Sequence, residues 1–305
     1  MSVVRESKQA YFFHAPAWAR VLEEAYGYRN ATRLYEVDGS DVLIPMVEKE
    51  RYGLITCSSM PFGYGGLLSR SDVPAEAIRQ IVSDIVGGRR LTLHLSLPPF
   101  ADLPMPGGLM IAEGNGEWGY THLLPLHEGF LHIWKHRFRQ DARRQVRQAE
   151  RYGVEVVDGR TQEDVRAFYG LYAESSRRWG YKEPPQPMAL YERLLEVGPP
   201  QVRLKLAMKD GTAIGGMVNL YYGQNAFGFA SASSRESAKY RPSALLVKVS
   251  IEEACEDGYA CFNLGASGSL EGVRRFKEDF GARQVGLREY RVASRLCRVL
   301  QAIRG

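Results

Sequence analysis

The stretch LYEVDGSDVLIPMV, residues 34–47, lies against a second stretch, LAMKDGTAIGGMV, at residues 206–218. In each, an apolar run meets an Asp-Gly pair, at 38–39 or at 210–211, and another apolar run follows. Because Asp-Gly tolerates the positive φ angles of a tight turn, each stretch predicts a β-hairpin. Two hairpins in matching surroundings indicate an internal duplication.

The same order of elements surrounds both hairpins. The first half predicts a helix from Pro16 to Gly27, an apolar strand region over 53–68, a helix over 74–86 and a strand over 91–97. The second half predicts a helix from Thr161 to Gly180, then a strand over 226–231, a helix over 243–256 and a strand over 259–264. Strands interleaved with helices predict an α/β (α+β) fold with a mixed sheet in each half.

A basic segment connects the halves. Residues 128–152 carry an apolar stripe from Phe138 to Ala149, and Gly153 follows as a stop, so we expect one connecting helix. The predicted domains are 1–150, which includes this helix and is completed by 291–305, and 151–290. The interface between two such domains is a natural place for a ligand cleft.

Composition sets limits on the class of protein. The chain has 305 residues, and its 45% hydrophobic content excludes global disorder. Its net charge of +5 does not by itself imply a nucleic-acid binder. Its four cysteines form no CxxC pair, and no HExxH, Walker or G-x-S-x-G motif occurs. We expect no metal site, no inserted membrane segment and a cytoplasmic location. We also expect a monomer, because the duplication supplies its own pseudo-dimer interface.

The first candidate site is KYRPSALLVKV, residues 239–249. Pro242 and Ser243 begin a helix whose free N–H groups, together with Lys239 and Arg241, can hold a phosphate or carboxylate. The alternative is an ordinary helix start with two solvated cations.

The second candidate is Lys277, within SGSLEGVRRFKEDFGAR at residues 267–283. It shares a helix face with Val273, Phe276 and Phe280, so a partly buried ammonium could stabilise the negative charge of an acyl-transfer intermediate, or hold a donor phosphate. The alternative is a lysine that extends from an amphipathic helix into water.

The third candidate is a ridge of arginines on the connecting helix. Arg139, Arg143 and Arg147 recur every fourth residue beside Arg144, a pattern that could contact a polyanion such as tRNA. A solvated helix face is the alternative.

Several segments together resemble one family. They are F-x-x-A-x-x-W at 12–18, RRQVRQAERYGV at 143–154, the KYRP segment, and FKEDFGA at 276–282. In this order, across nearly the whole chain, they resemble the Fem-type (FemABX-like) proteins, some relatives of which are grouped as acetyltransferase-like. The resemblance implies two tandem GNAT-like domains and transfer of an aminoacyl group from aminoacyl-tRNA to the amine of a peptidoglycan precursor.

The resemblance also implies roles for single residues. Phe276 and Lys277 would form the functional F-K pair, Arg20 would bind phosphates of the acceptor, and Arg177 and Tyr181 would occupy acceptor-binding positions. Lys239, Arg241, Ser243 and Ala244 lie where donor phosphates would bind, although RPSA at 241–244 replaces the R/Q-x-x-G-x-G/A signature of acyl-CoA enzymes.

Three hypotheses follow from these residues. The leading one is an amine acyltransferase whose donor co-substrate is aminoacyl-tRNA, with no covalently bound cofactor and a peptidoglycan precursor or small molecule as amine acceptor. A second is an acyl-CoA-dependent N-acetyltransferase. A third, from another class, is a non-catalytic RNA-binding or scaffold protein with the same fold.

Overall fold

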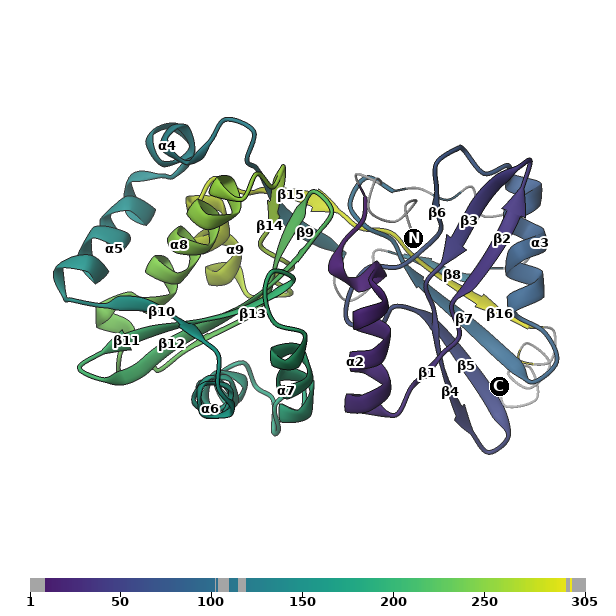
Figure 1. The fold of residues 1–305 in the computed structure, drawn as a ribbon, viewed down its shortest axis with the longest axis horizontal. Helices are drawn as coiled ribbons and strands as arrows, with labels where there is room; N and C mark the ends of the chain where they lie inside the picture. Colours follow the sequence, from purple (N-terminus) through teal and green to yellow (C-terminus); the bar gives the residue numbers. More distant parts are fainter. Residues whose placement is uncertain (1–8, 102, 104–109, 115–118, 295–296, 298–305) are drawn as a thin grey trace. The chain divides into compact units, whose positions relative to one another are not determined.

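A computed structural model describes residues 9–101, 103, 110–114, 119–294 and 297, and the chain divides into two compact units (Figure 1). Unit 1 consists of Met1–Tyr120 and Val285–Gly305, and unit 2 of Thr121–Gln284. Each unit contains a mixed sheet with helices packed on it, so the predicted fold class is confirmed.

Unit 1 has a six-stranded sheet and a small second sheet. The six strands, in order across the sheet, are β1 (Arg29–Asn30), β4 (Val47–Arg51), β5 (Leu54–Ser59), β7 (Arg90–Ser96), β16 (Glu289–Ala293) and β8 (Met110–Gly114). The second sheet contains β2 (Arg33–Val37), β3 (Ser40–Ile44) and β6 (Leu68–Ser69); the helical elements are η1 (Phe12–His14), α2 (Pro16–Tyr26) and α3 (Ala75–Ile85). β5 and β7 run parallel, whereas β7 and β16 are antiparallel.

Unit 2 is built on a seven-stranded sheet. Its strands, in order, are β10 (Glu155–Gly159), β11 (Val202–Lys209), β12 (Thr212–Tyr222), β13 (Asn225–Ser233), β14 (Cys261–Asn263), β9 (Tyr120–Pro125) and β15 (Arg283–Gly286). The helical elements are α4 (Phe130–His132), a π-helical turn η2 (Ile133–Arg137), α5 (Gln140–Arg151), α6 (Gln162–Arg178), α7 (Met188–Val197), η3 (Ala238–Tyr240), α8 (Pro242–Glu256) and α9 (Glu271–Asp279). Figure 1 shows α5, α8 and α9 on one face of this sheet and α6 and α7 on the other.

Both predicted hairpins form, but only the one in unit 2 stays within a single sheet. In unit 2, β11 and β12 pair across the turn as Lys209 with Thr212. In unit 1 the hairpin passes through both sheets: Arg33 pairs with Ile44 in the small sheet, and Asn30 pairs with Val47 in the large one. The ribbon bends between them because Pro45, which has no N–H, interrupts the longer strand.

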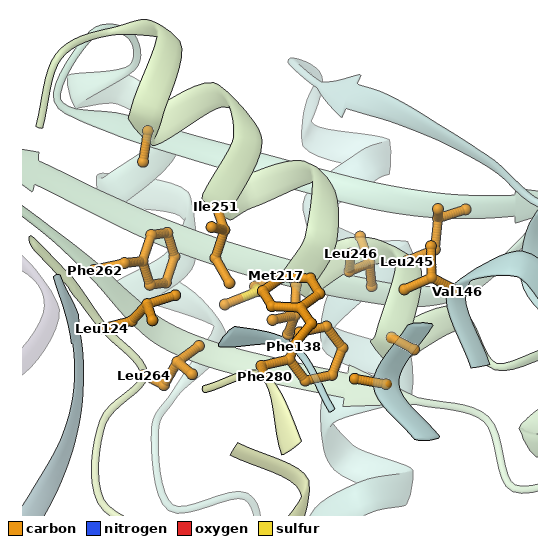
Figure 2. Packing of buried hydrophobic residues seen from close by; sticks show 14 of the residues in the cluster. Leu124, Phe138, Val146, Met217, Leu245, Leu246, Ile251, Phe262, Leu264 and Phe280 are labelled. Atoms are coloured by element: carbon orange, nitrogen blue, oxygen red, sulfur yellow. The ribbon is translucent and has the colours of Figure 1, made fainter. Parts of the chain in front are cut away.

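The core of unit 2 explains why α8 is apolar on more than one side. Leu245, Leu246 and Ile251 of α8 are buried in this core; Figure 2 shows Val146 of α5 on the side of Leu245 and Leu246, and Ile251 on the side of Phe262. A helix covered on two sides has little surface for polar residues.

The basic segment 128–152 differs from the prediction in two ways. It is not one helix: the chain is extended at Phe138, whose ring is buried 4.9 Å from that of Phe280, and the Arg139 N–H donates to the Asp279 carbonyl at 2.8 Å. Burial of this aromatic pair and the long-range hydrogen bond outweigh continuation of the helix. The segment also belongs to unit 2, so the predicted boundary near residue 150 is corrected to Tyr120.

Several elements escaped the sequence analysis. They are helix α7 and strands β8, β9, β15 and β16. The return of the C-terminal segment to unit 1 is seen in β16, whereas residues 295–296 and 298–305 lie outside the described part of the chain. Within the residues that the structure describes, no helix has the length and apolarity needed to span a bilayer.

Candidate active site in the second unit

Strands β13 and β14 pair at one end and then diverge, and we call the opening between them the fork. They run parallel and pair only over 225–227 with 261–263, after which β13 continues to Ser233 beside β12. A bulge between Val218 and Asn219 interrupts the β12–β13 register at the level where the fork opens. The carboxyl ends of diverging parallel strands are favoured ligand positions in α/β folds, since loops and helix starts meet there.

Lys277 lies at the base of this fork. Its Nζ donates to the carbonyl oxygens of Gly265 at 3.0 Å and Ala266 at 2.5 Å, both in the loop that follows β14. Phe276 and Phe280 pack on the same helix face, with ring centroids 5.0 Å apart. Among the described residues no carboxylate forms an ion pair with Lys277, so its amine is held by neutral carbonyls.

The loop that holds Lys277 is itself fixed by buried polar groups. Asn263 Oδ1 accepts from the Gly265 N–H at 2.8 Å and from the Thr121 hydroxyl at 2.6 Å. The Gly265 carbonyl also lies 3.3 Å from Nδ1 of His122, a fully buried side chain on β9. Gly265 adopts φ +73°, a conformation that favours glycine, and a Cβ there would lie 3.9 Å from Lys277 Nζ.

The surroundings favour the uncharged form of both bases. Burial lowers the pKa of Lys277 to about 7, because a desolvated ammonium is costly without a carboxylate beside it. The pKa of His122 is lowered as well, first by burial and then by the positive charge of Lys277. At neutral pH the Lys277 amine can therefore both gain and lose a proton, as acid–base chemistry requires.

The far end of the fork is cationic. Arg241, in a left-handed conformation with φ 57°, immediately precedes α8, and Pro242 is the first helical residue. Lys239 and Arg241 are exposed there. Ser243 Oγ lies 3.3 Å from Ser233 Oγ, which joins this helix start to the end of β13. The free N–H groups of the first turn and the two cations suit an anionic group.

The end of α6 reaches the same place. Arg178 donates to the Ser233 carbonyl at 2.7 Å, and Ser175 Oγ donates to the same oxygen at 3.3 Å. Arg177 and Tyr181, exposed and within a few residues of Arg178, thus lie near the start of α8. Arg20 is exposed on α2 of unit 1, and Ala244 is buried in the first turn of α8.

The arginines of the basic segment are largely engaged within the protein. Arg139 pairs with Asp279 at 3.3 Å and Arg144 with Asp141 at 3.0 Å. Arg143 donates to the carbonyls of Trp134 and Lys135, which are left open by the π-helical turn. Arg147 lies over the Trp134 ring, 6.0 Å from its centroid. These contacts reduce the number of arginine N–H groups that the ridge can offer to a polyanion, although the outer guanidinium groups stay exposed.

Sequence reasoning missed the residues that hold Lys277 in place. His122, Asn263 and Thr121 are not among the candidate residues that the sequence patterns indicate. Their signal is weak, because each is a single polar residue in a strand. The α/β topology alone brings β9 beside β14.

Comparisons with known proteins agree with this geometry. Residues 136–278 match a family model described as an acetyltransferase (GNAT) domain. No curated protein matches. Over these residues the chain is thus similar to acetyltransferase (GNAT) domains, and the matched stretch contains the fork and Lys277.

Solved structures share the whole fold. A crystal structure of FemX superposes with a TM-score of 0.75 at 13% identity, covering 99% of this chain and 96% of that one. A conserved protein from Bacteroides thetaiotaomicron gives 0.63 at 11%, with 96% and 93% covered. L-PGS from Bacillus licheniformis gives 0.54 at 14%, with 95% and 96% covered. The expected likeness to Fem-type proteins is confirmed for the fold.

Proposed function

We propose that this protein transfers an acyl group from an activated ester to a primary amine at the fork between β13 and β14. The observation that carries the proposal is the Lys277 amine, held at the base of the fork by two carbonyl oxygens. The match of residues 136–278 to a GNAT domain supports the same class of reaction.

The arrangement suggests a proton acceptor. Two carbonyls take two N–H groups of a neutral Lys277 amine, so its lone pair points in the remaining direction. As the acceptor amine attacks the donor carbonyl carbon, a new C–N bond forms and the attacking nitrogen gives its proton to Lys277. When the C–O or C–S bond to the donor breaks, the leaving group takes a proton from Lys277, which returns to the neutral amine.

The donor would lie along β13. From Gly228 to Ser233 an extended strand covers about 16 Å, which separates Lys277 from the cations at the start of α8. We propose that Lys239, Arg241 and the N–H groups at Ser243 and Ala244 bind donor phosphates. Following the Fem-type fold, the donor we propose is aminoacyl-tRNA, and the acceptor is an amine of a peptidoglycan precursor, with Arg177, Tyr181 and Arg20 as acceptor-binding residues.

An acyl-CoA donor is the second candidate. The GNAT-domain match favours it, and an acyl-CoA also combines phosphates with a long arm that ends in a reactive thioester. Thermal-shift titration separates the two, because a ligand that binds only the folded state raises the melting temperature. Stabilisation by charged tRNA and not by coenzyme A is the expected result; the reverse would assign the protein to acyl-CoA chemistry.

Replacement of Lys277 tests the reaction itself. Lys277→Met should lower kcat about 100-fold or more, the usual contribution of a general acid–base group. Arg275→Met, an exposed cation on the same helix, is the matched control and should retain full activity. Unchanged turnover in Lys277→Met would remove the assigned role of Lys277. Absence of turnover in the wild type, with salt-dependent RNA binding that Lys277→Met retains, would instead indicate the non-catalytic RNA-binding hypothesis.

The pH profile distinguishes base from ammonium. If Lys277 accepts the proton, kcat/KM rises as the pH increases through about 7, because the neutral amine is the active form. If the ammonium stabilises the oxyanion, activity falls over the same interval. A falling profile that is lost in Lys277→Met would rule out the base role.

A further inference from the structure

Unit 2 contains a cavity apart from the fork. It has a volume of about 500 Å³ and lies at the β10–β11 side of the sheet. Strands β12 and β13 separate β11 from β14, so three strand spacings, about 14 Å, lie between this side of the sheet and the loop that holds Lys277. The cavity is within the size range of small-molecule sites.

One wall of the cavity is apolar. Phe168 of α6, Tyr191 and Leu194 of α7, and Leu204 and Val218 of the sheet line it. Strand β10 ends at Gly159, opposite Leu204, whereas β11 begins two residues earlier at Val202, so the sheet edge is open where the cavity lies. This wall accommodates a branched or aromatic side chain.

The cavity spans the open edge of the sheet, and on the α8 side of that edge, opposite the apolar residues on the α6 and α7 side, its lining is a row of alternating charges. Lys205, whose side chain is 7% exposed, pairs with Asp158 at 2.7 Å and also with Glu253. The row extends in both directions, since Asp158 also pairs with Arg160 at 3.0 Å, and Glu253 pairs with Arg203 at 3.5 Å.

The row ends outside the cavity lining, where Arg203 also pairs with Asp257 at 2.5 Å. Three cations thus alternate with three carboxylates, and the row is neutral overall.

This balance limits what can bind. A ligand with one net charge would add an unpaired charge at a partly buried site, which is costly. A wholly apolar ligand would gain nothing from the charged wall. A zwitterion can extend the alternation, with its ammonium against a carboxylate and its own carboxylate against a cation, and remain neutral.

We propose that this cavity binds a free α-amino acid with a large apolar side chain. Its α-ammonium contacts Asp158 or Glu253, its α-carboxylate contacts Lys205 or Arg160, and its side chain enters the wall formed by α6, α7 and β11. The site does not depend on the reaction proposed at the fork.

Calorimetric titration of the whole protein with L-phenylalanine tests the proposal. Saturable binding of L-phenylalanine is expected. Three control probes should each bind at least about tenfold more weakly: N-acetyl-L-phenylalanine, which is an anion; phenethylamine, which is a cation; and L-alanine, which lacks the large side chain. Equal affinity for either singly charged probe would overturn the zwitterion assignment, and absence of L-phenylalanine binding would overturn the site.

Variants locate the binding. Asp158→Asn removes one carboxylate of the row, and Leu195→Trp, at a partly exposed position of the lining, fills the cavity; each should weaken L-phenylalanine binding about tenfold or more. Asp210→Asn, which removes an exposed ion pair outside the cavity, is the matched control and should bind as wild type does. Lys277→Met should also bind normally. Unchanged binding in both Asp158→Asn and Leu195→Trp, or loss in Lys277→Met, would place the ligand elsewhere.

Discussion

The two units repeat one order of elements but differ in how far their parallel strands stay paired. In unit 1, β5 pairs with β7 to its last residue, as Ser59 with Leu95. In unit 2, β13 pairs with β14 at its first three residues only and then leaves it. The duplicated fold thus provides a closed pair of strands in one copy and an open fork in the other.

The helix that follows the first of the two parallel strands, α3 in unit 1 and α8 in unit 2, also differs in the charge near its start. In unit 1, α3 begins with Pro74 as its N-cap and has Glu76 in its first turn. In unit 2, α8 has no acidic residue in its first turn and follows Lys239 and Arg241. An acidic first turn already occupies the positive end of a helix, whereas a basic approach leaves it for an external anion. The comparison supports the proposal that the donor binds at unit 2.

The largest expected effect concerns the support beneath Lys277. Phe280 is fully buried against Phe138 and Phe276, so Phe280→Ala should lower the free energy of unfolding by about 3–5 kcal/mol. Urea denaturation measures it, with Arg275→Ala on the exposed side of α9 as control. A loss below about 1 kcal/mol would mean that this aromatic cluster does not hold α9 in place.

The second effect is a pH dependence of stability. Between about pH 7 and 10.5, Lys277 is protonated in the unfolded chain and neutral in the folded one, so the free energy of unfolding rises with pH. Relative to Lys277→Met, wild type should gain about 2–4 kcal/mol across this interval, allowing for its partial exposure. Denaturation of both proteins from pH 6.5 to 10.5 measures it, and parallel curves would show that Lys277 is as well solvated as a surface lysine.

The third prediction concerns a substitution that gives the start of α8 an acidic residue, as at the start of α3. Lys239→Glu places an acid at the approach to the helix and should raise the KM for a phosphate-bearing donor about tenfold. The reciprocal change in unit 1, Glu76→Lys, should leave the KM unchanged. Equal effects of the two substitutions would contradict the assignment of the donor site to unit 2.

The smallest effect compares the first helices of the units. Thr161 and Asp164 form a capping box at the start of α6, with a 3.2 Å bond from the Asp164 N–H to Thr161 Oγ1, whereas α2 begins at Pro16 without a side-chain cap. Thr161→Ala should cost about 1 kcal/mol, the usual value for a lost N-cap. Thermal unfolding measures it, and no change would indicate that tertiary packing alone fixes the start of α6.

Sequence patterns predicted what depends on local chemistry. The two Asp-Gly turns, the Thr161 cap and the apolar face of α3 all appear in the structure because neighbouring residues determine them. Lys277 was identified for the same reason, since its helix face can be derived from residue spacing alone.

What the sequence did not predict depends on contacts between distant segments. The break at Phe138 requires Phe280, more than a hundred residues away, and the placement of His122 beside Gly265 requires β9 to join β14. The fork likewise depends on where one strand stops pairing with another, and no local pattern encodes that point.

The origin of β16 has a consequence for synthesis on the ribosome. The large sheet of unit 1 places β8 next to β16, and β16 comes from residues 289–293. Unit 2, by contrast, is one uninterrupted stretch. During synthesis from the N-terminus, the large sheet of unit 1 therefore waits for a strand that is translated after the whole of unit 2, and unit 2 can complete its own sheet first.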